Sequence, residues 1–298
     1  MQTSIERWWT NREDELNILA QIVRGERQER VFVIRAGAGY GKSWLIDRME
    51  DWCRREGVPC TRMDFDKSRE GMALSAEVVL EKAVETLRAP GMTAVERETV
   101  VRLIAEWRGG GASVSVAEEA KFKETGWYGD VANFIVKDLH VHAAGEGEPP
   151  ALRRRRATKR FCESLPAFAV QPLAWLVDTC EQADADTADW LCGEVVRRIA
   201  RGELPIVLVL AGRREFDMKS TIEGRGFDLK PEWEHAVCRL TLAPFDEVKT
   251  YQLAARAGLS LHEQAVAMLL ALTGGVPLEL VRALERYAQS RGIALWPG

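Results

Sequence analysis

The sequence predicts an α/β protein built on a parallel sheet with helices on both faces. Residues 173–177 and 206–210 are continuous apolar runs without the alternation of a half-exposed strand. Such runs are typical of parallel strands that helices cover on both sides. Segments with helical spacing alternate with strand-like runs up to residue 243, which is the pattern of a doubly wound sheet.

Five strands are expected in this sheet. Each is a short, mainly apolar run that ends in polar or turn-forming residues. In chain order they are residues 31–34, 60–65, 173–177, 206–210 and 236–242. The first leads into a glycine-rich segment, and the third ends directly at Asp178.

Helices are expected where apolar residues recur every three or four positions. In the α/β part they are residues 12–23, 44–56, 74–87, 95–107 and 187–200. Asn11 is the candidate N-cap of the first helix, and Trp44 is expected on the buried face of the second.

The pattern changes after residue 243, where helices alone follow. They are expected at residues 246–257, 261–272 and 277–290. We therefore predict an α/β domain over residues 1–243, with a helical insertion at about 70–165, and a small helical domain over residues 244–298.

Composition and charge narrow the class of protein. The chain has 298 residues, of which 46% are hydrophobic and 29% charged, and its net charge of −4 argues against attraction of nucleic acid by the whole surface. No segment is suited to span a membrane or serve as a signal peptide, so a cytoplasmic protein is expected. Six cysteines without metal-ligand spacing predict free thiols. The basic run at 153–160 is either a solvated helix face or a contact for nucleic acid or an acidic protein.

The glycine-rich segment is the most informative motif. A strand, a glycine-rich turn, Gly-Lys-Ser and a helix form the phosphate-binding loop of nucleoside-triphosphate proteins, where small residues let backbone N–H groups surround a phosphate. Lys42 is expected on the β- and γ-phosphates and the Ser43 hydroxyl on Mg²⁺. A dinucleotide-binding turn is excluded, because Lys42 stands where its third glycine is required. The predicted nucleotide contacts are Ala36, Gly37, Ala38, Gly39, Tyr40, Gly41, Lys42, Ser43 and Trp44.

Hydrolysis of a bound nucleotide needs further groups. Asp178, at the end of a buried strand, is the candidate second ligand of Mg²⁺, or else a simple turn residue. Glu181 is the candidate to activate water, or else part of the acidic start of the next helix. Arg213, or Arg214 as second choice, follows the next strand and is placed to contact a γ-phosphate, unless it pairs with Glu215 or another surface acid.

The order of these landmarks resembles the STAND NTPases, the AAA+-related group of signal-transducing switches that includes the NB-ARC and NACHT proteins. The resemblance covers residues 10–66 and 170–285. It rests on the Asn-Arg-Glu lead at residues 11–13, the phosphate loop, Asp178 with Glu181, Gly212-Arg213, and the Gly-Gly-Val-Pro segment that ends at Pro277. The resemblance implies a P-loop NTPase fold with a five-stranded parallel sheet of order 5-1-4-3-2 and a C-terminal helical lid. It also adds Arg12 and Pro277 to the nucleotide pocket.

The resemblance implies an ATPase of low turnover that works as a switch. ATP and Mg²⁺ are expected to close the lid, and the nucleotide state, ATP or ADP, to control assembly into a homo-oligomer or engagement of a separate effector or sensor protein. Such a switch must contact ATP and ADP differently, which we expect of Arg213 and the Pro277 loop. STAND proteins usually continue into a winged-helix domain and a sensor, so this chain is expected to be an excised module or a short ATPase that works with other chains.

Two other functions stay open. An AAA+-type helper ATPase that acts with DNA in transposition or replication is favoured by the basic run at 153–160. A small-molecule kinase would need an acceptor pocket and a base that the sequence does not reveal.

Overall fold

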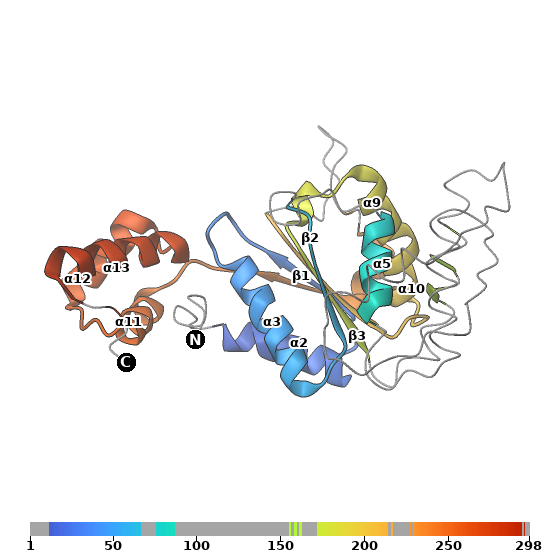
Figure 1. Cartoon of the computed structure of the whole chain (residues 1–298), viewed down its shortest axis with the longest axis horizontal. Helices are drawn as coiled ribbons and strands as arrows, with labels where there is room; N and C mark the ends of the chain where they lie inside the picture. The colour runs from blue at the N-terminus through green and yellow to red at the C-terminus, as the bar shows by residue number, and fades with distance from the viewer. Residues whose placement is uncertain are drawn as a thin grey trace, which may run out of the picture. The chain divides into compact units, whose positions relative to one another are not determined.

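The computed structural model describes residues 12–66, 76–86, 155, 158–159, 161–162, 172–213, 216, 227, 229–293 and 295. The chain divides into two compact units, Met1–Ala76 with Ala169–Gly298, and Glu77–Phe168 (Figure 1). The predicted helix at 95–107, Asn11, Arg214 and most of the basic run at 153–160 lie outside the described residues.

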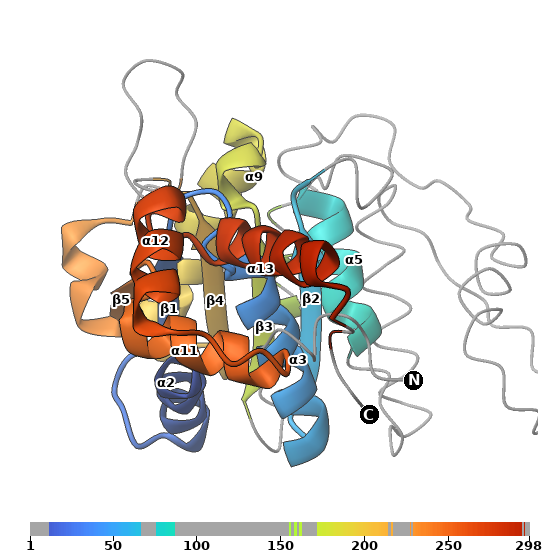
Figure 2. The same ribbon diagram turned by 90° about the vertical axis from the view of Figure 1, so that its left-hand side faces the viewer.

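The described residues form a five-stranded parallel sheet, as the sequence predicts. Its strands are β1 (Val31–Arg35), β2 (Cys60–Asp64), β3 (Leu173–Asp178), β4 (Ile206–Gly212) and β5 (Val237–Thr241). Their order is β2-β3-β4-β1-β5, which read from the other edge is 5-1-4-3-2 (Figure 2). The strand that ends in Gly212 therefore lies between the phosphate-loop strand and the strand that ends in Asp178.

Helices lie on both faces of the sheet (Figure 1). The described helices of the first unit are α2 (Glu13–Arg24), α3 (Lys42–Glu56), α9 (Ala185–Trp190), α10 (Arg197–Ala200), α11 (Glu247–Arg256), α12 (Glu263–Thr273) and α13 (Pro277–Arg291), and α5 (Ala76–Thr86) belongs almost wholly to the second unit. α2 and α3 cover one face, where Phe32, Leu176 and Val209 join their apolar side chains in one buried cluster. Alternate strand residues such as Trp175 and Leu208 are equally buried on the opposite face, where α9 and α10 lie.

Three local expectations need correction. The N-cap of α2 is Arg12 rather than Asn11, and its side chain caps no helix N–H group. The helix expected at 187–200 begins earlier, because the Asp184 carboxylate accepts the Thr187 N–H at 2.7 Å as a cap. This helix also contains a π-helical turn, η2 (Leu191–Val196), between α9 and α10, which apolar spacing does not reveal.

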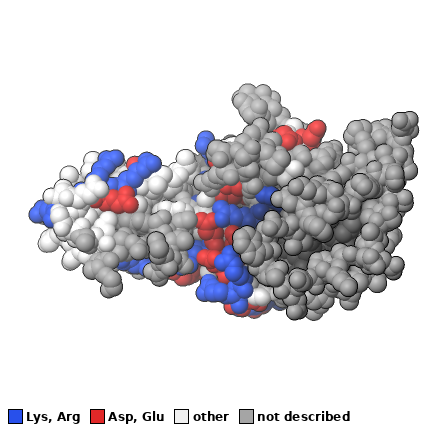
Figure 3. All heavy atoms as spheres, viewed as in Figure 1, with Lys and Arg blue, Asp and Glu red and all other residues white. Residues whose placement is uncertain are grey.

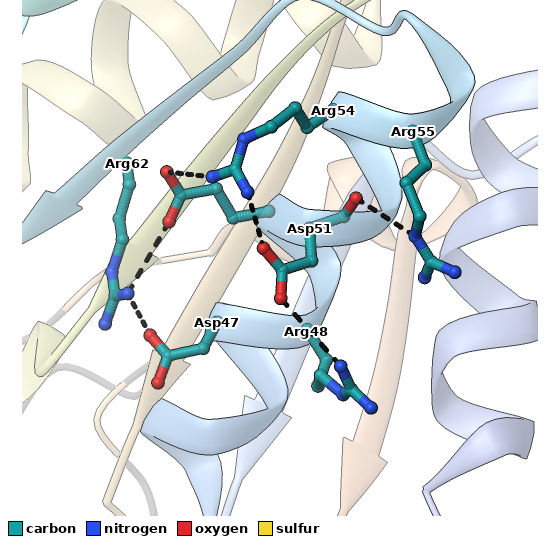
Figure 4. A network of polar contacts seen from close by, with 7 residues as sticks. Asp47, Arg48, Asp51, Arg54, Arg55 and Arg62 are labelled. Carbon is teal, nitrogen blue, oxygen red and sulfur yellow. Dashed lines mark hydrogen bonds and ion pairs between the residues drawn. The ribbon is translucent and has the colours of Figure 1, made fainter. Parts of the chain in front are cut away.

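A polar network fastens α3 to the edge strand β2 (Figure 4). Arg62 of β2 forms ion pairs with Asp47 and Glu50, which stand on one side of α3. Asp51 and Arg54, joined at 2.7 Å, extend the network along the helix. The network holds the helix whose first residue is Lys42.

The C-terminal helices α11, α12 and α13 have a core of their own. It contains Phe245, Leu253, Leu280 and Leu284. The linker from β5 joins the turn before α13 through a hydrogen bond from the Phe245 N–H to the Gly275 carbonyl, at 2.8 Å. Among the described residues, no helix is long and apolar enough to cross a membrane.

Replacement of Gly275 by alanine is expected to destabilise the fold more than the same change at Gly274. Both glycines have positive φ, 71° and 59°, which costs an alanine about 1 kcal/mol. At Gly275 a Cβ atom would also clash with the Phe245 carbonyl oxygen, whereas at Gly274 it would meet nothing within 4 Å. Urea denaturation of the two variants measures the difference, and equal losses of unfolding free energy would contradict this packing.

Candidate functional site

The glycine-rich segment forms a tight loop between β1 and α3. Gly39 and Gly41 have φ of 80° and 85°, left-handed values that favour glycine. At Gly37 a Cβ atom would lie 2.9 Å from the Tyr40 ring. Ala36 is buried and extends the sheet by donating its N–H to the Gly212 carbonyl at 3.2 Å. The conformation of the loop itself therefore favours glycine at positions 39 and 41.

Lys42 folds back over this loop. Its Nζ donates to the carbonyl oxygens of Ala36 at 3.0 Å and Gly37 at 2.9 Å. Burial lowers the pKa of the Lys42 ammonium, while the nearby carboxylates of Glu181 and Asp178 act in the opposite direction. The loop thus carries a positive charge beside glycine-rich backbone, which is the chemistry that a phosphate group requires.

Asp178 and Ser43 come together although they are far apart in the sequence. Asp178, at the end of β3, is only 1% exposed and stands opposite Asp64 of β2. Burial raises the pKa of the Asp178 carboxyl group; a hydrogen bond with Ser43 lowers it, and the Asp64 charge raises it further. A hydroxyl and a carboxylate are oxygen ligands that suit Mg²⁺, so this pair fits the predicted metal site.

Glu181 and Arg213 form an ion pair with each other. The Arg213 Nε lies 3.1 Å from Oε1 of Glu181, and the Arg213 backbone N–H donates to Oε2 at 3.0 Å. Arg213 therefore pairs with an acidic residue, which was one of the two expectations for it. That residue is Glu181, the candidate for activating water. Because the Arg213 side chain is 64% exposed, the pair contributes little to stability and can be exchanged for another partner.

Thr179 is a feature of the site that the sequence did not indicate. Its φ of 55° makes it the one non-glycine residue with positive φ in the described part of the chain, and β-branched residues rarely adopt this conformation. The Thr179 Oγ1 donates to Oδ1 of Asp64 at 2.7 Å, and its N–H donates to Oδ1 of Asp178 at 2.8 Å. The turn so fixed leads from β3 into the short helix η1 (Cys180–Gln182), which carries Glu181.

The remaining predicted residues connect the loop to the C-terminal helices. Pro277 is the first residue of α13, and the next residue, Leu278, donates its N–H to the Gly39 carbonyl at 3.1 Å. Arg12 lies 3.4 Å from the Tyr40 carbonyl oxygen. The sequence predicts Trp44 on the inner, buried stripe of α3, but its side chain is half-buried and packs against the core of the C-terminal helices. Helical spacing alone places Trp44 near the buried stripe of α3. It does not reveal that the C-terminal helices supply the apolar surface against which Trp44 packs.

Comparison with known proteins gives matches among solved structures. No protein-family model matches the sequence, and no curated protein matches it either. Cdc6p from Pyrobaculum aerophilum is similar over 96% of this chain and 64% of its own, with a TM-score of 0.50 and 13% identity.

Two further structures are similar at lower TM-scores. A STAND protein with a tetratricopeptide repeat sensor from Pyrococcus horikoshii has a TM-score of 0.47 and 15% identity, and covers 91% of this chain and 29% of its own. The ORC1 protein of Aeropyrum pernix, solved in complex with DNA, has a TM-score of 0.44 and 15% identity, over 98% and 63%. This chain thus spans less than two thirds of the length of each. Its sheet order, its phosphate loop and its likeness to Cdc6p show that it has an α/β fold of the P-loop NTPase kind.

Proposed function

We propose that this chain is an ATP-binding, slowly hydrolysing switch of the STAND kind, whose C-terminal helices act as the lid. The observation that carries the proposal is the direct contact between the phosphate loop and these helices. The Gly39 carbonyl accepts the Leu278 N–H, and Trp44, the neighbour of Ser43, packs on the helical core. A change at the loop therefore reaches the lid without an intermediate element.

The loop residues account for nucleotide binding. The N–H groups of the loop and of the first turn of α3 would hold the β-phosphate, and Lys42 would exchange the carbonyls of Ala36 and Gly37 for phosphate oxygens. Ser43 and Asp178 would hold Mg²⁺, which supplies neutralisation of charge on the phosphates. These roles use groups that already lie together.

The pair of Glu181 and Arg213 offers a way to distinguish ATP from ADP. Both oxygens of Glu181 are engaged by Arg213, so the carboxylate is held away from the task of orienting water. A γ-phosphate competes well for a guanidinium group, whereas ADP has none to offer. Bound ATP would therefore draw Arg213 away and leave Glu181 able to act as a base. The move of Arg213 from Glu181 to the γ-phosphate would also make the contacts with ATP differ from those with ADP, as a switch requires.

The alternative of a DNA-dependent helper ATPase has less support. It rests on the basic run at 153–160, most of which lies outside the described residues. On the face shown in Figure 3, described basic side chains lie beside acidic ones. A salt-dependent shift of duplex DNA would favour this alternative, because phosphate contacts weaken steeply with salt.

Light scattering after size-exclusion chromatography tests the switch. The protein with a non-hydrolysable ATP analogue and Mg²⁺ is expected to differ in mass or hydrodynamic radius from the protein with ADP. Lys42→Ala removes the ammonium from the loop, so this variant is expected to bind neither nucleotide and to behave alike in both. Identical behaviour of the unchanged protein in the two nucleotides would contradict the proposed switch.

Glu181→Gln is expected to keep nucleotide binding intact and to lower kcat about 100-fold, because an amide cannot accept a proton from water. Steady-state phosphate release and nucleotide titration measure the two quantities. Glu194→Gln is the matched control, since Glu194 pairs with Arg197 and Arg198 on the same connection between β3 and β4. Hydrolysis by Glu181→Gln at the normal rate would show that another group is the base.

Asp178→Asn is expected to stabilise the fold at neutral pH while weakening Mg²⁺-dependent nucleotide binding. Because burial raises the pKa of this carboxyl group, the folded state binds more protons than the unfolded state between the ordinary and the raised pKa. The unfolding free energy of the unchanged protein therefore falls as pH rises through that window, and Asp178→Asn lacks this contribution. Urea denaturation at several pH values measures it, and the same pH dependence in both proteins would contradict the assignment.

A further inference from the structure

Arg12 is a buried arginine with partners in three separate segments. The residue is only 4% exposed, and its Nη1 bonds to Oε1 of Glu15 at 2.8 Å. Its Nη2 donates to the Ala243 carbonyl at 3.1 Å and lies 3.4 Å from the Tyr40 carbonyl oxygen. The guanidinium carbon stands 5.3 Å from the centre of the Phe245 ring. One side chain thus joins the start of α2, the phosphate loop and the linker to the C-terminal helices.

These contacts belong to a closed circuit of hydrogen bonds. From the linker, the Phe245 N–H donates to the Gly275 carbonyl at 2.8 Å. Gly275 precedes α13, where the Leu278 N–H returns to the phosphate loop by donating to the Gly39 carbonyl at 3.1 Å. Arg12 closes the circuit between the loop and the linker. Two consecutive carbonyls of the phosphate loop are therefore held by groups from outside it.

The planarity of the peptide bond gives these contacts a consequence for the loop. In a trans peptide the C=O and the following N–H point in opposite directions. If the Gly39 carbonyl faces Leu278 and the Tyr40 carbonyl faces Arg12, the N–H groups of Tyr40 and Gly41 face the other side. N–H groups that point together away from such contacts form an anion-binding concavity.

We propose that Arg12 is a positioning residue that orients the N–H groups of the phosphate loop and ties this orientation to the C-terminal helices. This role differs from the contact with the nucleotide that the resemblance implies for Arg12, since its two terminal nitrogens bond to protein groups. The nucleotide part of the inference rests on the proposed function. The contact between loop and helix can be tested without nucleotide.

Amide hydrogen exchange of Leu278 reports the contact directly. As a first-turn residue of α13, Leu278 has no acceptor within the helix, so its protection depends on the Gly39 carbonyl. Arg12→Met keeps the apolar stem and removes the guanidinium. We expect it to speed exchange of the Leu278 amide about tenfold in the nucleotide-free protein, and to weaken binding of ADP with Mg²⁺ by a similar factor. Arg12→Lys is expected to lie in between, because an ammonium bonds to carbonyls but cannot fork between them.

The matched control is Arg24→Met at the other end of α2. Arg24 also pairs with a glutamate, Glu56 at 3.6 Å, and lies 6.0 Å from the centre of the Trp52 ring, but it is half exposed. Arg24→Met is expected to change neither the exchange rate of the Leu278 amide nor the affinity for ADP.

Unchanged Leu278 exchange in both Arg12 variants would overturn the inference, as would lower thermal stability with normal ADP affinity. If Arg12→Met does not fold, Arg12→Lys decides alone. Absence of ADP binding by the unchanged protein would remove the proposed function, while the exchange measurement would still decide the role of Arg12 in the loop–helix contact.

Discussion

The carbonyl oxygens of Gly39 and Tyr40 are the point at which three distant segments of the chain meet. Leu278 of α13 bonds to the first, and Arg12 at the start of α2 reaches the second and the Ala243 linker. A glycine-rich loop has many conformations open to it in isolation. Bonds to its outer carbonyls restrict that freedom before any ligand arrives, and preorganised donors lose less entropy on binding. The C-terminal helices thus help to fix the conformation of the phosphate loop.

Each of the charged groups Lys42, Asp178 and Glu181 has polar partners within the protein. Lys42 is held by loop carbonyls, Asp178 by Ser43 and Thr179, and Glu181 by Arg213. Each contact occupies a group that the proposed reaction would use elsewhere. A nucleotide with Mg²⁺ would replace these contacts by stronger ones between opposite charges, which makes the ligand the cause of the rearrangement. Burial raises the pKa of the Asp178 carboxyl group, because the charged form loses hydration there.

The sequence predicts those parts of the molecule in which the pattern of apolar residues along the chain matches their burial in the fold. β3 and β4 are continuous apolar runs because both faces of the sheet are covered, and the loop motif fixes its own glycines. Ser43 and Asp178 could be expected together, because parallel strands carry their site residues at one edge. The hydrogen bonds that hold the outer carbonyls of the phosphate loop could not be foreseen, because they join Arg12, Gly39 and Leu278 across long stretches of chain. Thr179 could not either, because a β-branched residue favours extended backbone.

The ratio of affinities for two nucleotides tests the central claim most directly. Calorimetric titration of the chain with ADP and with a non-hydrolysable ATP analogue, each with Mg²⁺, measures it. The proposed exchange of Arg213 from Glu181 to the γ-phosphate predicts different dissociation constants in the unchanged protein and a smaller difference in Arg213→Ala. Equal affinities in the unchanged protein would contradict the account, because the γ-phosphate would then gain nothing from Arg213.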